Sequence, residues 1–231
     1  MYSLDRSKES TAEHPLAPYS EHARLGLWLS GAARQANWLR AREEYTFYDL
    51  KAAVDNILRR AGIDSYTASV AECPANTIFC QALELKSPKG VVLGKLGVVA
   101  HDICRKLDVK ADVFYAELDW NVITRIAART NALYSPLPKA QPVKRDLSLL
   151  IDSKVTMADV EAAVRQAEKK ILTGIELFDV YEGEKLPEGK KSYAVSITLH
   201  DPEKTLQDKY IDKVMSKIID SLRRNLDAEL R

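Results

Sequence analysis

The sequence predicts an α+β protein with two successive antiparallel-sheet regions. Short β-like runs fill residues 66–120, which is typical of an antiparallel sheet. Three prolines then fall within a segment at about residues 134–143. Because proline fixes φ and removes a backbone donor, this segment is expected to be a linker. We therefore expect a lead-in segment at residues 1–19, a first domain at 20–135 and a second domain at 136–231.

The first domain is expected to open with a strand and a helix. Leucines alternate along Ala23–Gly31, which is typical of a strand that ends at a glycine turn. Between Thr46 and Gly62, apolar residues recur at helical spacing, so a helix with both ends marked is expected there. Further strands are expected at residues 66–72, 77–85, 90–100 and 113–120, with a short helix at 101–109.

The second domain shows the element order βαββαβ. This order is that of the ferredoxin-like sandwich, in which one antiparallel sheet carries two helices on one face. The closing residues 228–231 can add a short last strand. The main strands are expected at 145–152, 174–183 and 190–200, and the helices at 156–170 and 206–226.

Three of the expected helices share a start signal, a threonine three residues before an aspartate. The threonine oxygen can accept a hydrogen bond from a first-turn N–H, and the carboxylate is favoured near the positive helix end. We interpret these pairs as structural caps. They are Thr46 with Asp49, Thr156 with Asp159, and Thr205 with Asp208.

The strand at 190–200 has two unlike faces. Large apolar residues alternate with small ones that are almost uncharged, whereas a solvated strand face usually carries long polar residues. If the large residues face the helices, the small ones lie on a side of the sheet that no helix covers. The small residues are Ser192, Ala194, Ser196 and Thr198, and the large ones are Tyr193, Val195, Ile197 and Leu199. On the neighbouring strands, the same alternation places Leu177, Asp179, Tyr181, Asp146, Ser148 and Leu150 on the uncovered side, with Phe178 and Val180 facing the helices.

This uncovered side suits unstacked RNA bases. Bases stack on aromatic rings while phosphates meet cations at the edges of the sheet. The pattern alone leaves two other interpretations open, a covering protein domain or a face that is simply hydrated. The residues expected to contact RNA are Lys144, Arg145, Ser148, Asp179, Tyr181, Lys190, Lys191, Ser192, Ser196 and Thr198.

Composition and motifs argue against several other classes of protein. The net charge is only +1, so any nucleic-acid contact must depend on local clusters and shape. The three cysteines show no CxxC spacing, and no histidine pattern typical of zinc sites occurs. No phosphate-binding glycine loop or nucleophile elbow is present, and no apolar run is long enough to span a membrane. We expect a cytoplasmic chain with no catalytic residue, metal or cofactor of its own.

Several short motifs in a fixed order then indicate a family. They are FYDLK at Phe47–Lys51, PVKRDLSLLI at Pro142–Ile151, LFDVYEG at Leu177–Gly183, GKKSYA at Gly189–Ala194, TL at Thr205–Leu206 and the closing AELR. This set resembles the C-terminal part of the bacterial phenylalanyl-tRNA synthetase beta subunit, from about residue 20 to residue 231.

The resemblance implies a division of roles. Residues 20–135 correspond to a catalytically silent relative of the class II synthetase core, and residues 136–231 to a ferredoxin-fold anticodon-binding domain. The implied partners are tRNA for phenylalanine and the alpha subunit, in an α2β2 tetramer whose ATP and magnesium sites lie outside this chain.

Two alternatives stay open. The chain can be purely an assembly module whose uncovered sheet side is covered by another protein domain. Some ferredoxin-like domains instead bind small metabolites or hydrolyse acyl phosphates. Hydrolysis of acyl phosphates calls for an arginine in an anion-binding loop with a nearby asparagine, and Arg145 lies at a strand start without such a loop.

Overall fold

The computed structural model describes residues 2–64, 66–74, 77–130, 134, 138, 140–183 and 185–231. The chain divides into two compact units, residues 1–133 and 134–231, which are described separately below. Much of the expected linker, residues 135–137 and 139 with Pro136 among them, lies outside the described residues.

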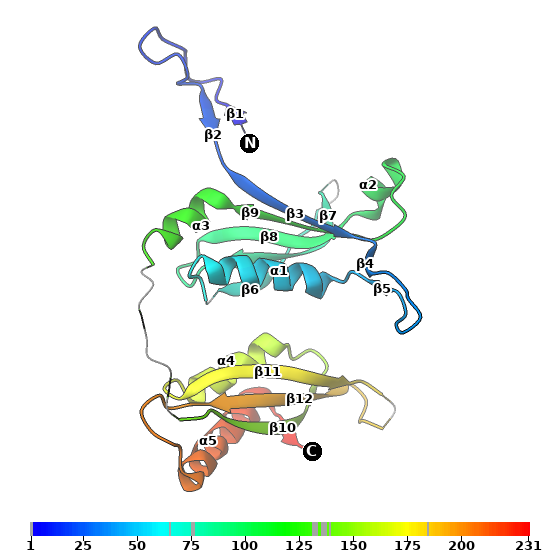
Figure 1. Ribbon diagram of the computed structural model, residues 1–231, viewed down its shortest axis with the longest axis vertical. Coiled ribbons are helices and arrows are strands. Elements are labelled where there is room, and N and C mark those ends of the chain that lie inside the picture. Colours follow the sequence, from blue (N-terminus) through cyan, green and yellow to red (C-terminus); the bar gives the residue numbers. More distant parts are fainter. Residues whose placement is uncertain are drawn as a thin grey trace. The chain divides into compact units, whose positions relative to one another are not determined.

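The first unit is organised around a five-stranded antiparallel sheet in the order β3-β9-β8-β7-β6 (Figure 1). The described helices of this unit are α1 (Phe47–Arg60), α2 (His101–Lys106) and α3 (Trp120–Ala127). The strands are β3 (Arg24–Ser30), β6 (Thr67–Ala71), β7 (Phe79–Lys86), β8 (Val92–Val99) and β9 (Val113–Asp119).

Helix α1 packs its apolar stripe on one face of this sheet. Leu50, Val54 and Leu58 are fully buried in a core that also contains Leu96 and Leu118. The helix begins as expected, because the Asp49 carboxylate accepts hydrogen bonds of 2.7 Å from both the N–H and the hydroxyl of Thr46. These bonds lower the pKa of Asp49.

Four short strands and helix α3 were not expected from the sequence. The lead-in segment pairs β1 (Tyr2–Leu4) with β2 (Tyr19–Glu21), and β4 (Ala32–Arg34) pairs with β5 (Glu43–Glu44). Helix α3 starts where the last strand was expected to end, because the Asp119 carboxylate accepts a 3.0 Å bond from Val122 N–H.

The second unit is a four-stranded antiparallel sheet in the order β11-β12-β10-β13, with helices α4 and α5 (Figure 1). This arrangement confirms the predicted α+β class and the βαββαβ order. The strands are β10 (Val143–Asp152), β11 (Leu172–Tyr181), β12 (Lys190–Leu199) and β13 (Glu229–Leu230), and the helices are α4 (Met157–Ala167) and α5 (Asp208–Leu226).

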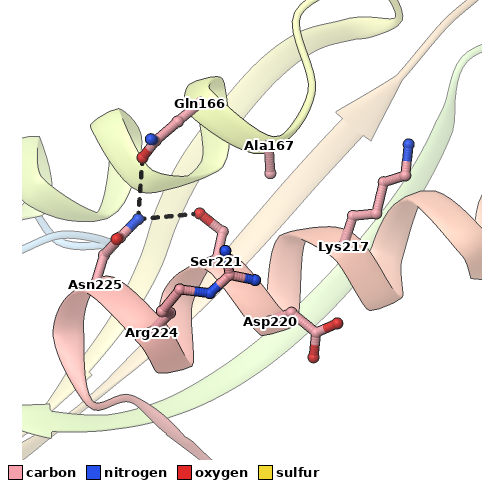
Figure 2. A pocket seen from close by; sticks show the side chains of 7 residues that line it. All are labelled: Gln166, Ala167, Lys217, Asp220, Ser221, Arg224 and Asn225. Atoms are coloured by element: carbon pink, nitrogen blue, oxygen red, sulfur yellow. Dashed lines mark hydrogen bonds between the residues drawn. The ribbon is translucent and has the colours of Figure 1, made fainter.

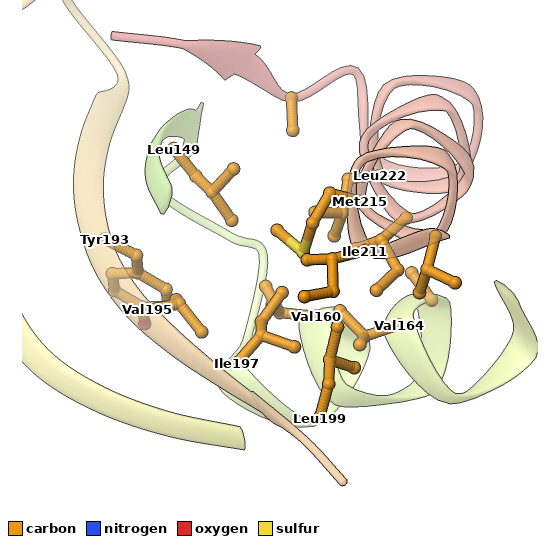
Figure 3. Close-up of a cluster of buried hydrophobic side chains, with 14 of the residues drawn as sticks. Leu149, Val160, Val164, Tyr193, Val195, Ile197, Leu199, Ile211, Met215 and Leu222 are labelled. Carbon is orange, nitrogen blue, oxygen red and sulfur yellow. The ribbon is translucent and has the colours of Figure 1, made fainter. Parts of the chain in front are cut away.

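The core of the second unit lies between the sheet and the two helices. Figure 3 shows the large residues of β12 pointing at α4 and α5, so the predicted inward face of this strand is confirmed. Val195, Ile197 and Leu199 are each at most 1% exposed. Their partners from the helices include Val160, Val164, Ile211, Met215 and Leu222.

Only one of the two predicted caps in the second unit is present. The Thr156 hydroxyl accepts a hydrogen bond from Asp159 N–H, and the Asp159 carboxylate bonds back to Thr156. The prediction for Thr205 is wrong, because α5 begins at Asp208 with Gln207 in the cap position. Leu206 is 8% exposed within the core, so the packing of this residue helps to place the start of α5.

Candidate functional site

The side of the second sheet opposite α4 and α5 is the candidate site, and we call it the open face. Residues directly opposite each other on paired strands point to the same side, so the register fixes the members of this face. From β10 and β12 they are Lys144, Asp146, Ser148, Leu150, Asp152, Lys190, Ser192, Ala194, Ser196 and Thr198, and from β11 and β13 they are Gly174, Glu176, Asp179, Tyr181 and Glu229.

Two irregularities in β11 change part of the predicted alternation. The register shifts between Leu172 and Gly174 and again between Leu177 and Asp179. Leu177 pairs with Val195 and packs on the core, so its predicted place on the open face is wrong. An extra residue in one strand resets the alternation beyond it, which keeps Asp179 on the open face.

The aromatic part of β11 is more exposed than expected. Phe178, which was expected to face the helices, lies in the second irregularity and is 55% exposed. Val180 pairs with Tyr193, which places it on the helix-facing side of the sheet, but Val180 is still 48% exposed. The end of β11 therefore combines exposed apolar groups with the polar open face.

Tyr181 is the last residue of the outer strand β11 and lies on the open face. It is 38% exposed and stands opposite Ser192 in the register. The guanidinium of Arg231 lies over its ring at 5.9 Å. Ser192 in turn has its Oγ 3.5 Å from the Oγ of Ser148. The structure thus brings an aromatic ring, two hydroxyls and a cation together.

The two serines of β12 are less accessible than the pattern implied. Ser192 and Ser196 are each 6% exposed, because β12 is an inner strand of the sheet. Thr198 is half-buried. These residues make a flat floor, and a ligand on the open face would meet the longer side chains of the neighbouring strands first.

The open face is not basic. Lys144 is paired with Glu176 across the face at 3.7 Å, with both side chains largely exposed. Lys190 stands opposite Asp152 in the register. The described cations of this face are Lys144, Lys190 and Arg231, and its carboxylates are Asp146, Asp152, Glu176, Asp179 and Glu229.

Two predicted RNA contacts do not lie on the open face. Lys191 stands opposite the buried Ile151, is 7% exposed, and places its Nζ 4.7 Å from the Tyr193 ring centre. Arg145 stands opposite Ile197, and its guanidinium lies 3.7 Å from the Asp208 carboxylate at the start of α5. Because strand residues alternate between sides, both basic side chains belong to the helix-facing side.

Sequence reasoning missed Arg231 as a member of the site. The residue was noted only as the end of a recognisable motif and an optional strand. The alternation of side chains along the last strand could have identified it. Counted from the buried Ala228, this alternation places Glu229 and Arg231 on the open face and Leu230 on the helix-facing side.

A second surface feature lies between the helices, away from the open face. Figure 2 shows a pocket of about 340 Å³ whose lining includes Lys217 and Arg224. Its polar groups already join the two helices, since Asn225 Nδ2 donates to Gln166 Oε1 at 3.0 Å and Ser221 Oγ donates to the Ala163 carbonyl at 2.8 Å. We interpret this pocket as part of the helix packing.

Comparison with known proteins follows the same division of the chain. The family model of the phenylalanyl tRNA synthetase beta chain CLM domain matches residues 4–120, and that of the ferredoxin-fold anticodon binding domain matches residues 138–231. The chain belongs to the phenylalanine–tRNA ligase beta subunit family. The resemblance predicted from the motifs is thereby confirmed.

Individual relatives of the family agree with this assignment. The beta subunit of phenylalanine–tRNA ligase from Porphyromonas gingivalis is 42% identical over 96% of the chain. The subunit of the same name from Bacteroides fragilis is 41% identical over 100% of the chain, and that from Clostridium acetobutylicum is 34% identical over 80%. The chain spans only 27%, 28% and 23% of the lengths of these three relatives.

Two other features are absent from the part of the chain that the structure describes. Within the described residues, no helix is long and apolar enough to cross a membrane. The same residues contain no group of three or more His, Cys, Asp or Glu side chains arranged as metal ligands would be.

Proposed function

We propose that this chain is a non-catalytic part of a phenylalanine–tRNA ligase, and that its second unit binds the anticodon region of tRNA. The observation that carries the proposal is the match of residues 138–231 to an anticodon-binding domain whose open face presents Tyr181. The limits of the two domains, 20–135 and 136–231, remain part of this proposal.

The proposed contacts follow from the open face. Tyr181 offers a ring for one unstacked base, and Ser148 on β10 offers a small polar contact on the same face. Thr198 offers another such contact toward the opposite end of β12, where it pairs with Gly174. Lys144 and Lys190 meet phosphates at the rim of the face. Asp179, on the same face, offers an acceptor for a hydrogen bond from a base edge.

The remaining predicted contacts have weaker support. Arg145 is partly exposed but paired with Asp208 on the helix-facing side, so it can reach RNA only around the strand end. Ser192, Ser196 and Lys191 have little free surface. We therefore assign no main contact to these four residues.

The first unit has a proposed structural role. It supports assembly with an alpha subunit in an α2β2 tetramer, in which the attachment of phenylalanine to tRNA takes place. ATP and magnesium are proposed to act elsewhere in that assembly. A cytoplasmic location is part of the same proposal.

The test is a titration of the 231-residue chain with an anticodon stem-loop of phenylalanine tRNA at several salt concentrations. Two phosphate contacts predict that log K falls with log salt with a slope of about −1.4, which is roughly a sevenfold loss between 50 and 200 mM. Lys144→Ala should reduce this slope, and Lys217→Ala is the matched control because Lys217 lies on α5. An unmodified chain that binds no stem-loop at low salt would refute the proposal.

A purely structural role is the second candidate. Its support is the pair of exposed apolar side chains Phe178 and Val180 at the edge strand β11. In that case Phe178→Ser should weaken assembly with the alpha subunit and leave stem-loop binding unchanged, which a pull-down and the same titration would separate.

A further inference from the structure

The loop between β4 and β5 is a defined turn that projects beyond the five-stranded sheet of the first unit (Figure 1). The side chain of Asn37 organises its tip, since Oδ1 accepts 2.9 Å hydrogen bonds from the N–H groups of Leu39 and Arg40. The Asn37 N–H also donates to the Arg40 carbonyl at 2.9 Å. At the base of the hairpin, Tyr45 N–H donates to the Gly31 carbonyl at 2.9 Å. The loop therefore has a fixed shape that its own residues supply.

This turn places two large apolar side chains in solvent. Trp38 and Leu39 are 94% and 66% exposed, and no large apolar side chain of the described residues is more exposed than Trp38. Trp28 in the same unit differs, because its ring stacks on Tyr115 with 3.8 Å between the ring centres. A tryptophan can remove about 150–250 Å² of surface from water when it is buried. We call Trp38 and Leu39 the tip pair, and its burial requires a partner.

Ion pairs neutralise most of the charge of this hairpin. Arg34 Nη1 lies 3.2 Å from Glu43 Oε2, and Arg42 Nε lies 2.7 Å from Glu44 Oε1. Arg40 directly follows the tip pair in the sequence. Among the described residues, no carboxylate forms an ion pair with Arg40, so one uncompensated positive charge lies beside the tip pair.

We propose that the tip pair inserts into an apolar pocket of the alpha subunit, and that Arg40 pairs with a carboxylate at the rim of that pocket. This proposal rests on the proposed assembly of the first unit with an alpha subunit, and it names the residues that make the contact. Tryptophan and arginine are enriched among the side chains that dominate the binding energy of protein interfaces. Because the turn is ordered before binding, little conformational entropy is lost when it docks.

The charge of the hairpin favours a protein over RNA as the occupant. An RNA backbone is bound by several cations, which displace its counterions. Arg34 and Arg42 are already neutralised, and the carboxylates that neutralise them would repel phosphates. One free cation beside an apolar tip instead matches an apolar pocket with a carboxylate at its rim.

Two pockets of this chain are unsuited to the tip pair, which argues against a second copy as the occupant. One pocket is lined in part by Lys217 and Arg224, and the other by Arg105 and Lys110. Both would place cations against Arg40. Most side chains in both linings are polar, so neither pocket could bury an indole ring among apolar groups.

The experiment measures binding of the cognate alpha subunit to the 231-residue chain by biolayer interferometry. Trp38→Ala should weaken this binding at least about thirtyfold, as expected for a central interface side chain. Arg40→Ala should weaken it about fivefold, and Arg40→Glu should weaken it more, since two carboxylates would then meet at the rim. Val70→Ala is the matched control, because Val70 is also apolar and 85% exposed but lies on β6. Its affinity for the alpha subunit should stay within about twofold of the unmodified chain.

Fluorine NMR locates the contact independently of affinity. The 231-residue chain labelled with 5-fluorotryptophan gives signals for Trp28, Trp38 and Trp120, and Trp38→Phe assigns one of them. Addition of unlabelled alpha subunit should shift the Trp38 signal and leave the other two in place. Circular dichroism of every variant establishes that it is folded.

The outcomes separate this contact from the proposed assembly. Binding of the alpha subunit that Trp38→Ala leaves unchanged, or a Trp38 signal that does not shift, would overturn the contact and leave the assembly intact. If Trp38→Ala weakened stem-loop binding instead, the tip pair would belong to RNA. If the unmodified chain formed a dimer that Trp38→Ala dissociates, the tip pair would belong to a second copy, and either result overturns the proposal. Absence of any binding of the alpha subunit by the unmodified chain would overturn both the contact and the proposed assembly.

Discussion

Replacing Ile197 by alanine is expected to destabilise the second unit by at least about 2.4 kcal/mol. The side chain is fully buried, and the substitution removes three carbon groups at about 0.8 kcal/mol each. The residual cavity adds to this cost, with about 5 kcal/mol as the upper end for such changes. Thr198→Ala, one residue along the same strand, should cost less than about 1 kcal/mol because Thr198 lies on the open face.

The assay is urea unfolding of the 231-residue chain with two probes. Far-UV circular dichroism reports both units, whereas tryptophan fluorescence reports only the first, since Trp28, Trp38 and Trp120 all lie before residue 133. Ile197→Ala should shift the circular dichroism transition and leave the fluorescence transition in place. A fluorescence transition that shifts with it would show that the two units unfold together.

Only one of the two variants should change RNA affinity. Measured where both are folded, Ile197→Ala should bind the stem-loop as the unmodified chain does, and Thr198→Ala should bind less tightly. Equal destabilisation by the two substitutions would refute the assignment of one side of β12 to the core and the other to the open face.

Two further predictions concern the folding of each unit. Thr156→Ala should destabilise the second unit by about 1 kcal/mol through loss of a helix cap, measured by urea unfolding. Hydrogen bonds from Thr156 hold the pKa of Asp159 below its usual value of 3.8. The ionised Asp159 therefore stabilises the fold above that pH, and this stabilisation is lost as the pH falls through the lowered pKa. Asp159→Asn should abolish this pH dependence. In the first unit, Gly97→Ala should disrupt the sheet, because an added Cβ would lie 2.1 Å from the Gln81 carbonyl oxygen. Gly26→Ala is the control, since a Cβ there would meet no atom closer than 3.5 Å. Unfolding followed by tryptophan fluorescence should show a loss of stability for Gly97→Ala but not for Gly26→Ala.

Local signals in the sequence predicted most of the fold. Thr46 and Thr156 were correctly identified as helix starts because a cap depends on residues within one turn. The same motif failed at Thr205, where the burial of Leu206 decides how the chain enters α5. A cap motif therefore predicts a helix start only where tertiary packing permits it.

The candidate site was harder to predict, because it depends on how strands pair. Alternation along β12 needed no partner strand, and its two sides were assigned correctly. On β11 the extra residue near Phe178 resets the alternation, and no residue type in that stretch marks such an irregularity. Arg231 joins Tyr181 only through the pairing of β13 with β10, which connects parts of the chain far apart in sequence.

The balance of charge on the open face bears on how such a site can select its ligand. Three cations share the face with five carboxylates, so a phosphate backbone laid across its centre would meet net repulsion. A base that stacks on Tyr181, with its phosphates at the rim of the face near Lys144 and Lys190, avoids this repulsion. The affinity for RNA then depends more on stacking than on charge, and stacking contributes only about 1–3 kcal/mol of binding free energy per base. A contact of this strength is effective when other parts of an assembly hold the same RNA, since linked contacts raise the effective concentration at each site. The proposed anticodon contact is accordingly expected to be weak in the 231-residue chain and much stronger in an assembled ligase.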